Sequence, residues 1–134
     1  MKISLLTVLF FIIVLLFSQC NNNADKAAKN NKDLGQNMQD MQIYHDNLGT
    51  SLRNKEMENA VWLLEGMDSS LLVIAANFDR HRKLTVAFEK TYQDKLQPVI
   101  KNIRTSLAEN NFPNAISAYR VLTNNCNNCH KEHN

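Results

Sequence analysis

Two cysteines and a histidine near the C-terminal end of the chain have a spacing that suits one kind of chemistry. Cys126, Cys129 and His130 form a C-x-x-C-H motif. On a helix, residues three and four positions apart share a face, so both thiols and the imidazole can point at one planar group. The thiols can add to the two vinyl groups of a haem while the imidazole binds its iron. The motif is typical of c-type haem attachment.

Two other uses of the motif remain open in the sequence. A thioredoxin-like redox pair places its first cysteine at a helix N-terminus in a βαβ unit, whereas this motif ends a helical segment. A zinc site is the stronger competitor, because His133 adds a fourth potential ligand at plausible spacing. His133 is one residue from the C-terminus, however, and such a site would close almost no loop. We therefore rank haem attachment first, zinc second and thiol redox chemistry third.

Residues 1–19 predict a lipoprotein-type signal peptide. Lys2 supplies a positive start, and residues 5–17 are thirteen residues that are apolar with one exception. A membrane-spanning helix needs about 20. The stretch that ends in Gln19 and Cys20 resembles a bacterial lipoprotein cleavage site, although a small residue is usual at the position of Gln19. We expect a lipid on Cys20 and export to the periplasmic side of a membrane; an ordinary cleaved leader and an uncleaved anchor remain alternatives.

Cysteine count, length and charge agree with this interpretation. The chain has three cysteines, so one for lipid and two for haem leave none for a disulfide. Removing 19 of the 134 residues leaves 115, which is the size of one domain. The formal charge falls from +2 to +1 when Lys2 is removed. So small a charge gives no reason to expect nucleic acid or an anionic membrane surface as a partner.

The mature sequence predicts a tether followed by one helical domain. Residues 20–33 are polar and lack an apolar period, which favours a solvated, lipid-anchored tether. Residues 34–134 show no alternating strand pattern, and the whole chain has only three Gly and two Pro. The predicted fold is all-α: an antiparallel up-down-up-down four-helix bundle whose last helix carries the haem attachment motif at its C-terminal end.

The helices are predicted from apolar residues at steps of three and four. The first runs from the N-cap Asp33 to about residue 52, the second starts near Asn54, the third covers about 92–110, and the fourth begins at Pro113; 79–91 form a polar connection. The predicted inward faces are Leu34, Met38, Met41, His45, Leu48 and Leu52; Met57, Ala60, Leu64, Met67, Leu71, Ile74 and Phe78; Leu96, Val99, Ile100, Ile103 and Leu107; and Phe112, Ile116, Tyr119, Thr123, Cys126 and His130. Trp62 and Phe112 are also predicted to be core, and the basic residues 80–83 are predicted to lie at the haem end.

The register of such a bundle predicts which residues face the iron. Counting equal numbers of residues along the first and last helices places His130 opposite residues 34–41, within about one turn. A thioether is a good soft ligand for haem iron, so Met38 is the preferred sixth ligand and Met41 an alternative. His45 lies roughly 10 Å further along the same face and could bind only a more deeply placed haem. An open sixth position is the remaining alternative.

The same residues resemble a known family. A four-helix bundle with C-x-x-C-H at the end of its last helix is similar to cytochrome c-prime and the related low-spin bundle cytochromes. The stretch Leu34-Gly35-Gln36-Asn37-Met38 resembles the Leu-Gly-x-x-Met that opens the first helix of low-spin members, in which the methionine binds iron. The resemblance covers about residues 34–131 and implies that role for Met38. Members with an open iron usually place an apolar residue over it, whereas this helix has Met41 and His45 there.

The expected function is electron transfer rather than catalysis. The sequence shows no Ser/His/Asp order and no phosphate-binding loop. His/Met ligation keeps the iron geometry similar in both oxidation states, which favours electron exchange. We expect a membrane-tethered c-type cytochrome with one covalent haem that serves an extracytoplasmic redox partner protein. The alternatives are a five-coordinate, cytochrome c-prime-like protein that binds nitric oxide or carbon monoxide, and a structural lipoprotein with zinc. The sequence does not determine whether the chain is a monomer or a homodimer.

Overall fold

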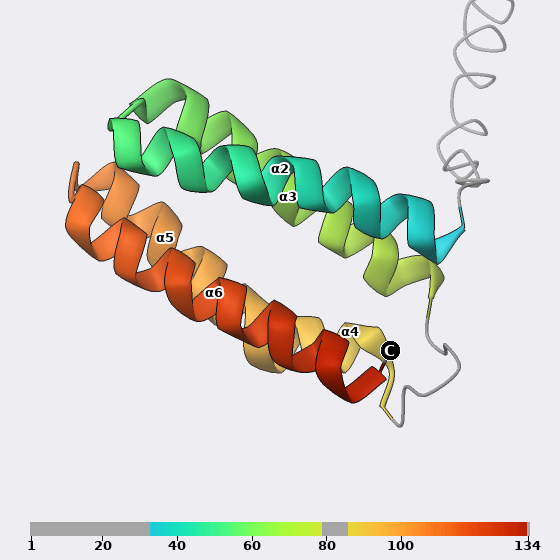
Figure 1. Cartoon of the computed structure of the whole chain (residues 1–134). Coiled ribbons are helices and arrows are strands. Elements are labelled where there is room, and N and C mark those ends of the chain that lie inside the picture. The colour runs from blue at the N-terminus through green and yellow to red at the C-terminus, as the bar shows by residue number, and fades with distance from the viewer. Residues whose placement is uncertain (1–32, 79–85, 134) are drawn as a thin grey trace, which may run out of the picture. The chain divides into compact units, whose positions relative to one another are not determined.

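The computed structural model describes residues 33–78 and 86–133, and every structural observation below concerns these ranges. Within them the chain forms helices and no strand, and the helices pack along one another as a bundle (Figure 1). The all-helical bundle expected from the sequence is therefore confirmed. The predictions for the signal peptide, Cys20, residues 20–32 and the basic residues 80–83 fall outside the described ranges.

Helix α2 (Leu34–Asn54) begins where the sequence predicts. The Asp33 side chain caps it by accepting a hydrogen bond from the Gln36 N–H at 2.8 Å. Helix α3 (Met57–Asn77) begins three residues later than the predicted Asn54, because the intervening residues close the end of α2. Lys55 adopts a left-handed conformation (φ 59°), its N–H donates to the Leu52 carbonyl at 3.3 Å, and Glu56 N–H donates to the Ser51 carbonyl at 2.9 Å. These two hydrogen bonds form a Schellman motif.

The third helical segment is continuous but irregular. It consists of α4 (Phe88–Thr91), the π-helical turn η1 (Tyr92–Leu96) and α5 (Gln97–Ala108). It starts four residues before the predicted Tyr92, because the buried side chain of Phe88 extends the core face. Pro98 accounts for the wider turn, since it has no N–H and its ring clashes with the carbonyl four residues earlier in a regular α-helix. In η1 the Gln97 N–H donates to the Tyr92 carbonyl five residues back.

Helix α6 (Phe112–His133) carries the motif at its C-terminal end. The Asn111 side chain accepts a hydrogen bond from the Asn114 N–H at 3.2 Å, which caps the helix start. The buried face of α6 differs from the predicted stripe, of which only Phe112 is fully buried. Its buried residues are Phe112, Ala115, Ala118 and Leu122; Ile116, Tyr119, Thr123 and Cys126 are half-buried, and His130 is exposed. The prediction assumed one narrow seam, but α6 packs on both α5 and α2.

The bundle core combines residues of all the long helices. The largest fully buried apolar side chains are Leu48, Leu52, Leu64, Met67, Leu71, Ile74, Ile100, Ile103, Leu107 and Leu122. Phe112 is core, as predicted, but the prediction for Trp62 is wrong, because its side chain is 63% exposed. Its neighbours Leu63 and Leu64 occupy the buried face of α3 instead. The Trp62 ring rests against Tyr44 of α2, with ring centroids 5.8 Å apart.

Two glycines allow aromatic rings to approach the neighbouring helix closely. A Cβ atom added to Gly49 of α2 would lie 2.5 Å from the Tyr119 hydroxyl oxygen of α6. A Cβ added to Gly66 of α3 would lie 2.5 Å from a ring carbon of Tyr44 on α2. No real Cβ tolerates such distances, so the missing side chains let α2 pack closely against both partners.

Helix α3 is the one helix in the described ranges whose length and hydropathy would also suit a membrane span. Its most apolar window has a mean hydropathy of 1.2. The inward residues Leu64, Met67 and Ile74 are buried in the bundle core. The apolar character of α3 is therefore explained by a core helix of a globular bundle.

Candidate cofactor site

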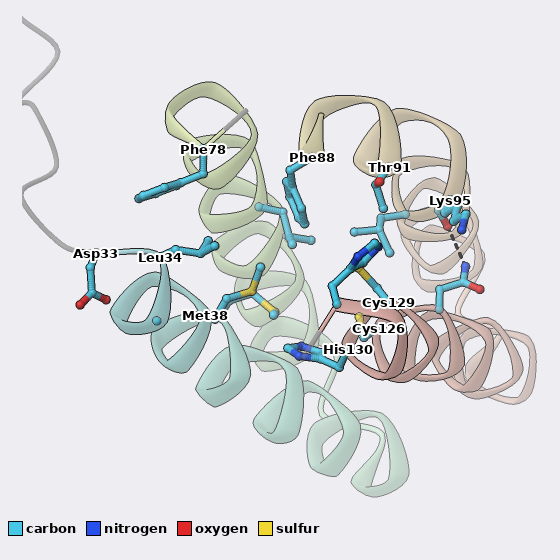
Figure 2. A pocket seen from close by; sticks show the side chains of 16 residues that line it. Asp33, Leu34, Met38, Phe78, Phe88, Thr91, Lys95, Cys126, Cys129 and His130 are labelled. Carbon is cyan, nitrogen blue, oxygen red and sulfur yellow. Dashed lines mark hydrogen bonds between the residues drawn. The ribbon is translucent and has the colours of Figure 1, made fainter. Parts of the chain in front are cut away.

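A cavity of about 660 Å³ lies at the end of the bundle that carries the motif. This volume falls within the range of about 300–1,000 Å³ that is usual for small-molecule and cofactor sites. The beginning of α2, the end of α3, the α4–η1 segment and the end of α6 form its walls (Figure 2). Its lining residues are Asp33, Leu34, Gly35, Met38, Met41, Leu71, Phe78, Phe88, Thr91, Lys95, Leu96, Asn125, Cys126, Cys129, His130 and His133.

The cavity brings together most of the site residues expected from the sequence. Cys126, Cys129 and His130 line it from α6, and Met38 and Met41 line it from α2. Met41 is buried and Met38 is half-buried, whereas the His130 imidazole is exposed. Figure 2 shows that Met38 and the three motif residues border the same space. A planar group bound to the motif could therefore lie within reach of either methionine.

The two cysteines are free thiols in surroundings that disfavour the thiolate. Burial raises the pKa of Cys126 to about 11, and burial followed by the nearby Glu132 carboxylate raises the pKa of Cys129. Zinc binding and thiol–disulfide exchange both need the thiolate. Surroundings that stabilise a thiolate lower the pKa of the thiol. A thioether is neutral, so burial imposes no comparable penalty on it. These surroundings therefore favour a neutral sulfur, whether thiol or thioether, over a free thiolate.

Cys126, Cys129, His130 and His133, considered above as zinc ligands, do not converge on one point. His133 lines the cavity, yet no group of three or more His, Cys, Asp or Glu side chains is arranged to hold a metal ion in the described part of the chain. The geometry of α6 explains this result. Cys126 and His133 are seven residues apart on one continuous helix, which separates them by about 10 Å along its axis. A straight helix cannot wrap the four side chains around one ion.

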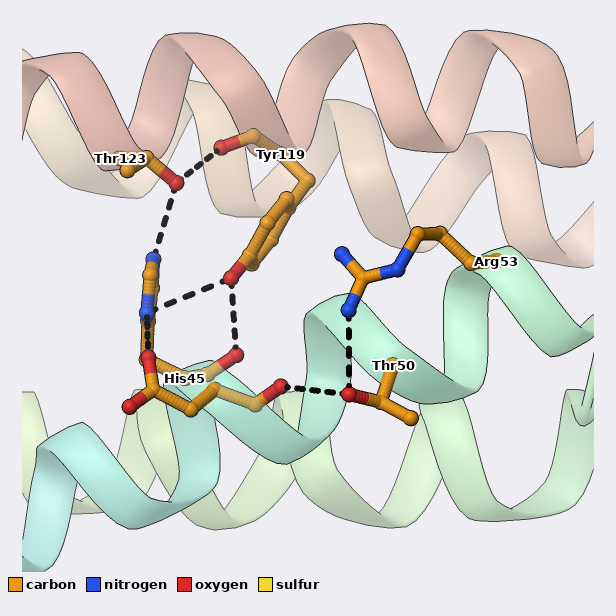
Figure 3. A network of polar contacts seen from close by, with 6 residues as sticks. His45, Thr50, Arg53, Tyr119 and Thr123 are labelled. Carbon is orange, nitrogen blue, oxygen red and sulfur yellow. Dashed lines mark hydrogen bonds and ion pairs between the residues drawn. The ribbon is translucent and has the colours of Figure 1, made fainter.

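His45, the third candidate for the sixth ligand, does not line the cavity. Both of its ring nitrogens have other partners: Nδ1 lies 3.0 Å from the Asp46 carboxylate, and Nε2 lies 2.9 Å from the Thr123 hydroxyl (Figure 3). Its ring stacks on Tyr119, with centroids 4.8 Å apart. The Tyr119 hydroxyl donates to the His45 carbonyl at 3.1 Å. His45 thus joins α2 to α6, and its spacing in the sequence could not distinguish that role from iron binding.

The hydrogen-bond order Thr123–His45–Asp46 resembles that of a hydrolase triad, but its chemistry differs. The Thr123 hydroxyl has a single hydrogen, and the Tyr119 carbonyl of its own helix accepts a hydrogen bond from it at 3.0 Å, beside the His45 Nε2 at 2.9 Å. Nε2 of His45 and the Tyr119 carbonyl therefore lie at similar distances from one hydroxyl, whereas a catalytic triad directs that hydrogen to the histidine alone. The arrangement is therefore a structural connection between α2 and α6.

Four lining residues were not foreseen in the sequence. They are Phe88, Thr91, Lys95 and Asn125. Phe88 and Thr91 belong to the predicted polar connection 79–91, and Lys95 lies in the first turn of the predicted third helix. Asn125, directly before the motif, donates from its side-chain amide to the Lys95 carbonyl at 2.8 Å. The four-residue spacing of Phe88, Tyr92 and Leu96 is the signal that could have extended the helix to include this wall.

Comparison of the chain with models of known protein families gave no match, and comparisons with characterised proteins and with solved structures gave none either. Function must therefore be inferred from the chemistry of the cavity and of the motif. The wall of Leu34, Leu71, Phe78, Phe88 and Leu96 is apolar, and a small number of polar side chains, half of them on α6, border it. This combination is usual for a site that holds an organic cofactor.

Proposed function

We propose that this chain is a small c-type cytochrome with one covalent haem. Cys126 and Cys129 would hold the haem through thioethers, and His130 and Met38 would bind its iron. The observation that carries the proposal is the cavity, which gathers the complete C-x-x-C-H motif and a methionine from a distant helix around one largely apolar space. The raised pKa of Cys126 adds support, because burial favours a neutral sulfur at this position.

We further propose the antiparallel up-down-up-down topology for the bundle. Residue pairs between α2 and α6 support it: His45 meets Thr123, whereas the position of Gly49 meets Tyr119. Residues with higher numbers in α2 therefore contact residues with lower numbers in α6, which means that the two helices run in opposite directions. Short connections between α2 and α3 and between α5 and α6 agree with antiparallel neighbours.

Each residue has a defined task in this proposal. Bound haem iron supplies a one-electron couple. The His130 imidazole and the Met38 thioether supply one nitrogen and one sulfur ligand, both neutral. Leu71 and Phe88 give the cofactor an apolar surface to pack against, and a preformed site changes little between oxidation states. The protein then passes electrons to an extracytoplasmic redox partner protein, without catalysis of its own, while lipidated Cys20 holds it at the membrane.

The attachment test uses the full chain produced in a bacterium that matures c-type cytochromes. We expect a red protein whose haem stays with the polypeptide after denaturation and gives the pyridine haemochrome of haem c. The double variant Cys126→Ala/Cys129→Ala is the control and should lose the covalent haem. A colourless wild-type protein, with the mass of the bare processed polypeptide plus lipid, would overturn the proposal.

The five-coordinate alternative also has an observation in its favour. Leu34, Leu71 and Phe78 line the cavity beside the two methionines, so apolar side chains are available to cover an open iron. The optical spectrum distinguishes the two forms. A high-spin ferric spectrum, with ready carbon monoxide binding after reduction, would identify a gas-binding protein, whereas a low-spin spectrum supports electron transfer.

A further inference from the structure

The π-helical turn η1 forms part of the cavity wall. Thr91, Lys95 and Leu96 all line the cavity, and the turn spans Tyr92–Leu96. π-helical turns within α-helices are frequent at functional sites. The position of this turn beside the C-x-x-C-H motif therefore calls for a physical explanation.

The turn corrects the register of the helix. The buried residues Phe88, Tyr92, Leu96 and Ile100 recur every four residues. An α-helix has 3.6 residues per turn, so each four-residue step rotates about 40° beyond a full turn and three steps rotate about 120°. One extra residue in a π turn offsets most of this rotation. The turn thus keeps all four side chains on the core face and keeps Thr91 and Lys95 beside the cavity.

Hydrogen bonds hold the turn from two directions. The Tyr92 hydroxyl donates to the Asp68 carboxylate of α3 at 2.7 Å. From α6, the Asn125 side-chain amide donates to the Lys95 carbonyl at 2.8 Å (Figure 2). Asn125 is the residue directly before Cys126, so this second bond connects the wall to the start of the motif.

We infer that Asn125 is a positioning residue of the haem site: its hydrogen bond to the Lys95 carbonyl in the π turn fixes the cavity wall relative to the attachment cysteines. The inference rests on the proposed haem function. When the bond is lost, the wall of Thr91 and Leu96 separates from α6, the haem can move away from α2, and the Met38 thioether competes less well with external ligands.

The test is the affinity of the reduced holoprotein for carbon monoxide, which must displace the sixth ligand. In Asn125→Asp the shape is kept but the donor is lost. We expect the affinity to rise about fivefold, which corresponds to the loss of one hydrogen bond of ordinary net strength. The matched control is Asn124→Asp, which makes the same change at an exposed neighbour that does not line the cavity and should leave the affinity unchanged.

A second variant removes the turn itself. Deletion of the exposed Gln93, combined with Pro98→Ala to restore the missing N–H, leaves the core residues at steps of four, three and four, which suit a regular α-helix. This helix should fold with unchanged helix content and show the same higher affinity. Asn125→Asp should have no additional effect in it, because the two changes remove one shared interaction.

The outcomes separate the two proposals. Wild-type protein without covalent haem would overturn the proposed function before any variant is compared. If haem is attached and Asn125→Asp has the affinity of wild type and of Asn124→Asp, the positioning role is wrong while the haem function stands. A variant that only lowers the free energy of unfolding, with unchanged carbon monoxide affinity, would likewise contradict the positioning role.

Discussion

Met38 and His45 lie seven residues apart on α2, yet their side chains have very different surroundings. Met38 borders the cavity and has a thioether that needs no hydrogen bond. His45 has hydrogen-bond partners at both ring nitrogens and lies outside the cavity lining. Iron binding by His45 would break the contact with Thr123 or that with Asp46. The surroundings therefore favour Met38 over His45 as the sixth ligand.

We predict that Met38→Leu converts a low-spin ferric haem to the high-spin form and abolishes the methionine-to-iron charge-transfer band. Leucine keeps the side-chain volume, and such exchanges usually cost less than about 1.5 kcal/mol of stability, so the bundle should still fold. The ferric optical spectrum provides the measurement. Met57→Leu is the control, because Met57 is also half-buried near a helix start but does not line the cavity.

A Met38→Leu protein that remains low-spin would show that another residue binds the iron. Met41→Leu and His45→Gln, examined in the same way, would then identify it. Met41 is the nearer candidate because it lines the cavity.

At the scale of helices, the sequence predicted the regular elements and missed the irregular one. Steps of three and four apolar residues located α2, most of α3 and the inward face of α5 correctly, because these helices bury one continuous stripe. The pattern of three- and four-residue steps did not identify Phe88 and Tyr92 as core residues. Their repeated four-residue spacing keeps one face of a helix buried only when a π turn intervenes. Pro98 and the four-residue spacing of Phe88 and Tyr92 together indicate a π turn. Each of them also fits a helix that begins later.

The candidate site could be predicted only in part. The motif is local, and the register of two helices was sufficient to bring Met38 to it. The contact between Asn125 and Lys95 joins residues thirty positions apart and depends on the π turn, so no local pattern contains it. Trp62 was misplaced because aromatic character predicts burial only on average, and the helices of residues 33–78 and 86–133 cover its face of α3 only in part.

Tyr92 connects the π turn to α3 and should make stability depend on pH. Burial, followed by the hydrogen bond to Asp68, raises the pKa of Tyr92 from 10 to about 12. Between these values the folded state binds more protons than the unfolded state, so the free energy of unfolding falls as pH rises from 10 to 12. Below pH 10 the full contribution is present.

We predict that Tyr92→Phe lowers the free energy of unfolding by about 1 kcal/mol at pH 7, the usual net value of a hydrogen bond. The variant should also lose less stability than wild type between pH 10 and 12. Urea unfolding of both proteins across this range provides the measurement, and their difference cancels other groups that titrate in the same window. Tyr44→Phe, at the α2–α3 aromatic contact, is the control. Parallel pH profiles for Tyr92→Phe and wild type would contradict the assignment.

At the scale of the whole molecule, charge and anchoring determine where the protein can act. The formal charge of +1 after removal of residues 1–19 gives little electrostatic attraction to a membrane surface. The proposed membrane attachment therefore depends on the lipid proposed on Cys20.

We predict that wild-type protein is found in the membrane fraction and that Cys20→Ser is found in the soluble extracytoplasmic fraction with an unchanged haem spectrum. Cell fractionation followed by haem staining provides the measurement, and intact mass identifies the lipid. If both proteins stay in the membrane, an uncleaved leader is the anchor. If both are soluble, the leader is of the ordinary cleaved type and the lipid assignment is wrong.

The contact of Gly49 with Tyr119 has a consequence for the opposite part of the molecule. A methyl group at residue 49 would overlap the Tyr119 ring, so that either this ring moves or α2 and α6 separate. From that point α2 leads back to Met38 while α6 leads on to His130, so a small separation at this contact becomes larger where the two proposed iron ligands face each other. The bond lengths that an iron atom tolerates are narrow. A substitution at Gly49 therefore tests whether the spacing of the two proposed ligands is set by the packing of Tyr119 more than two helical turns away.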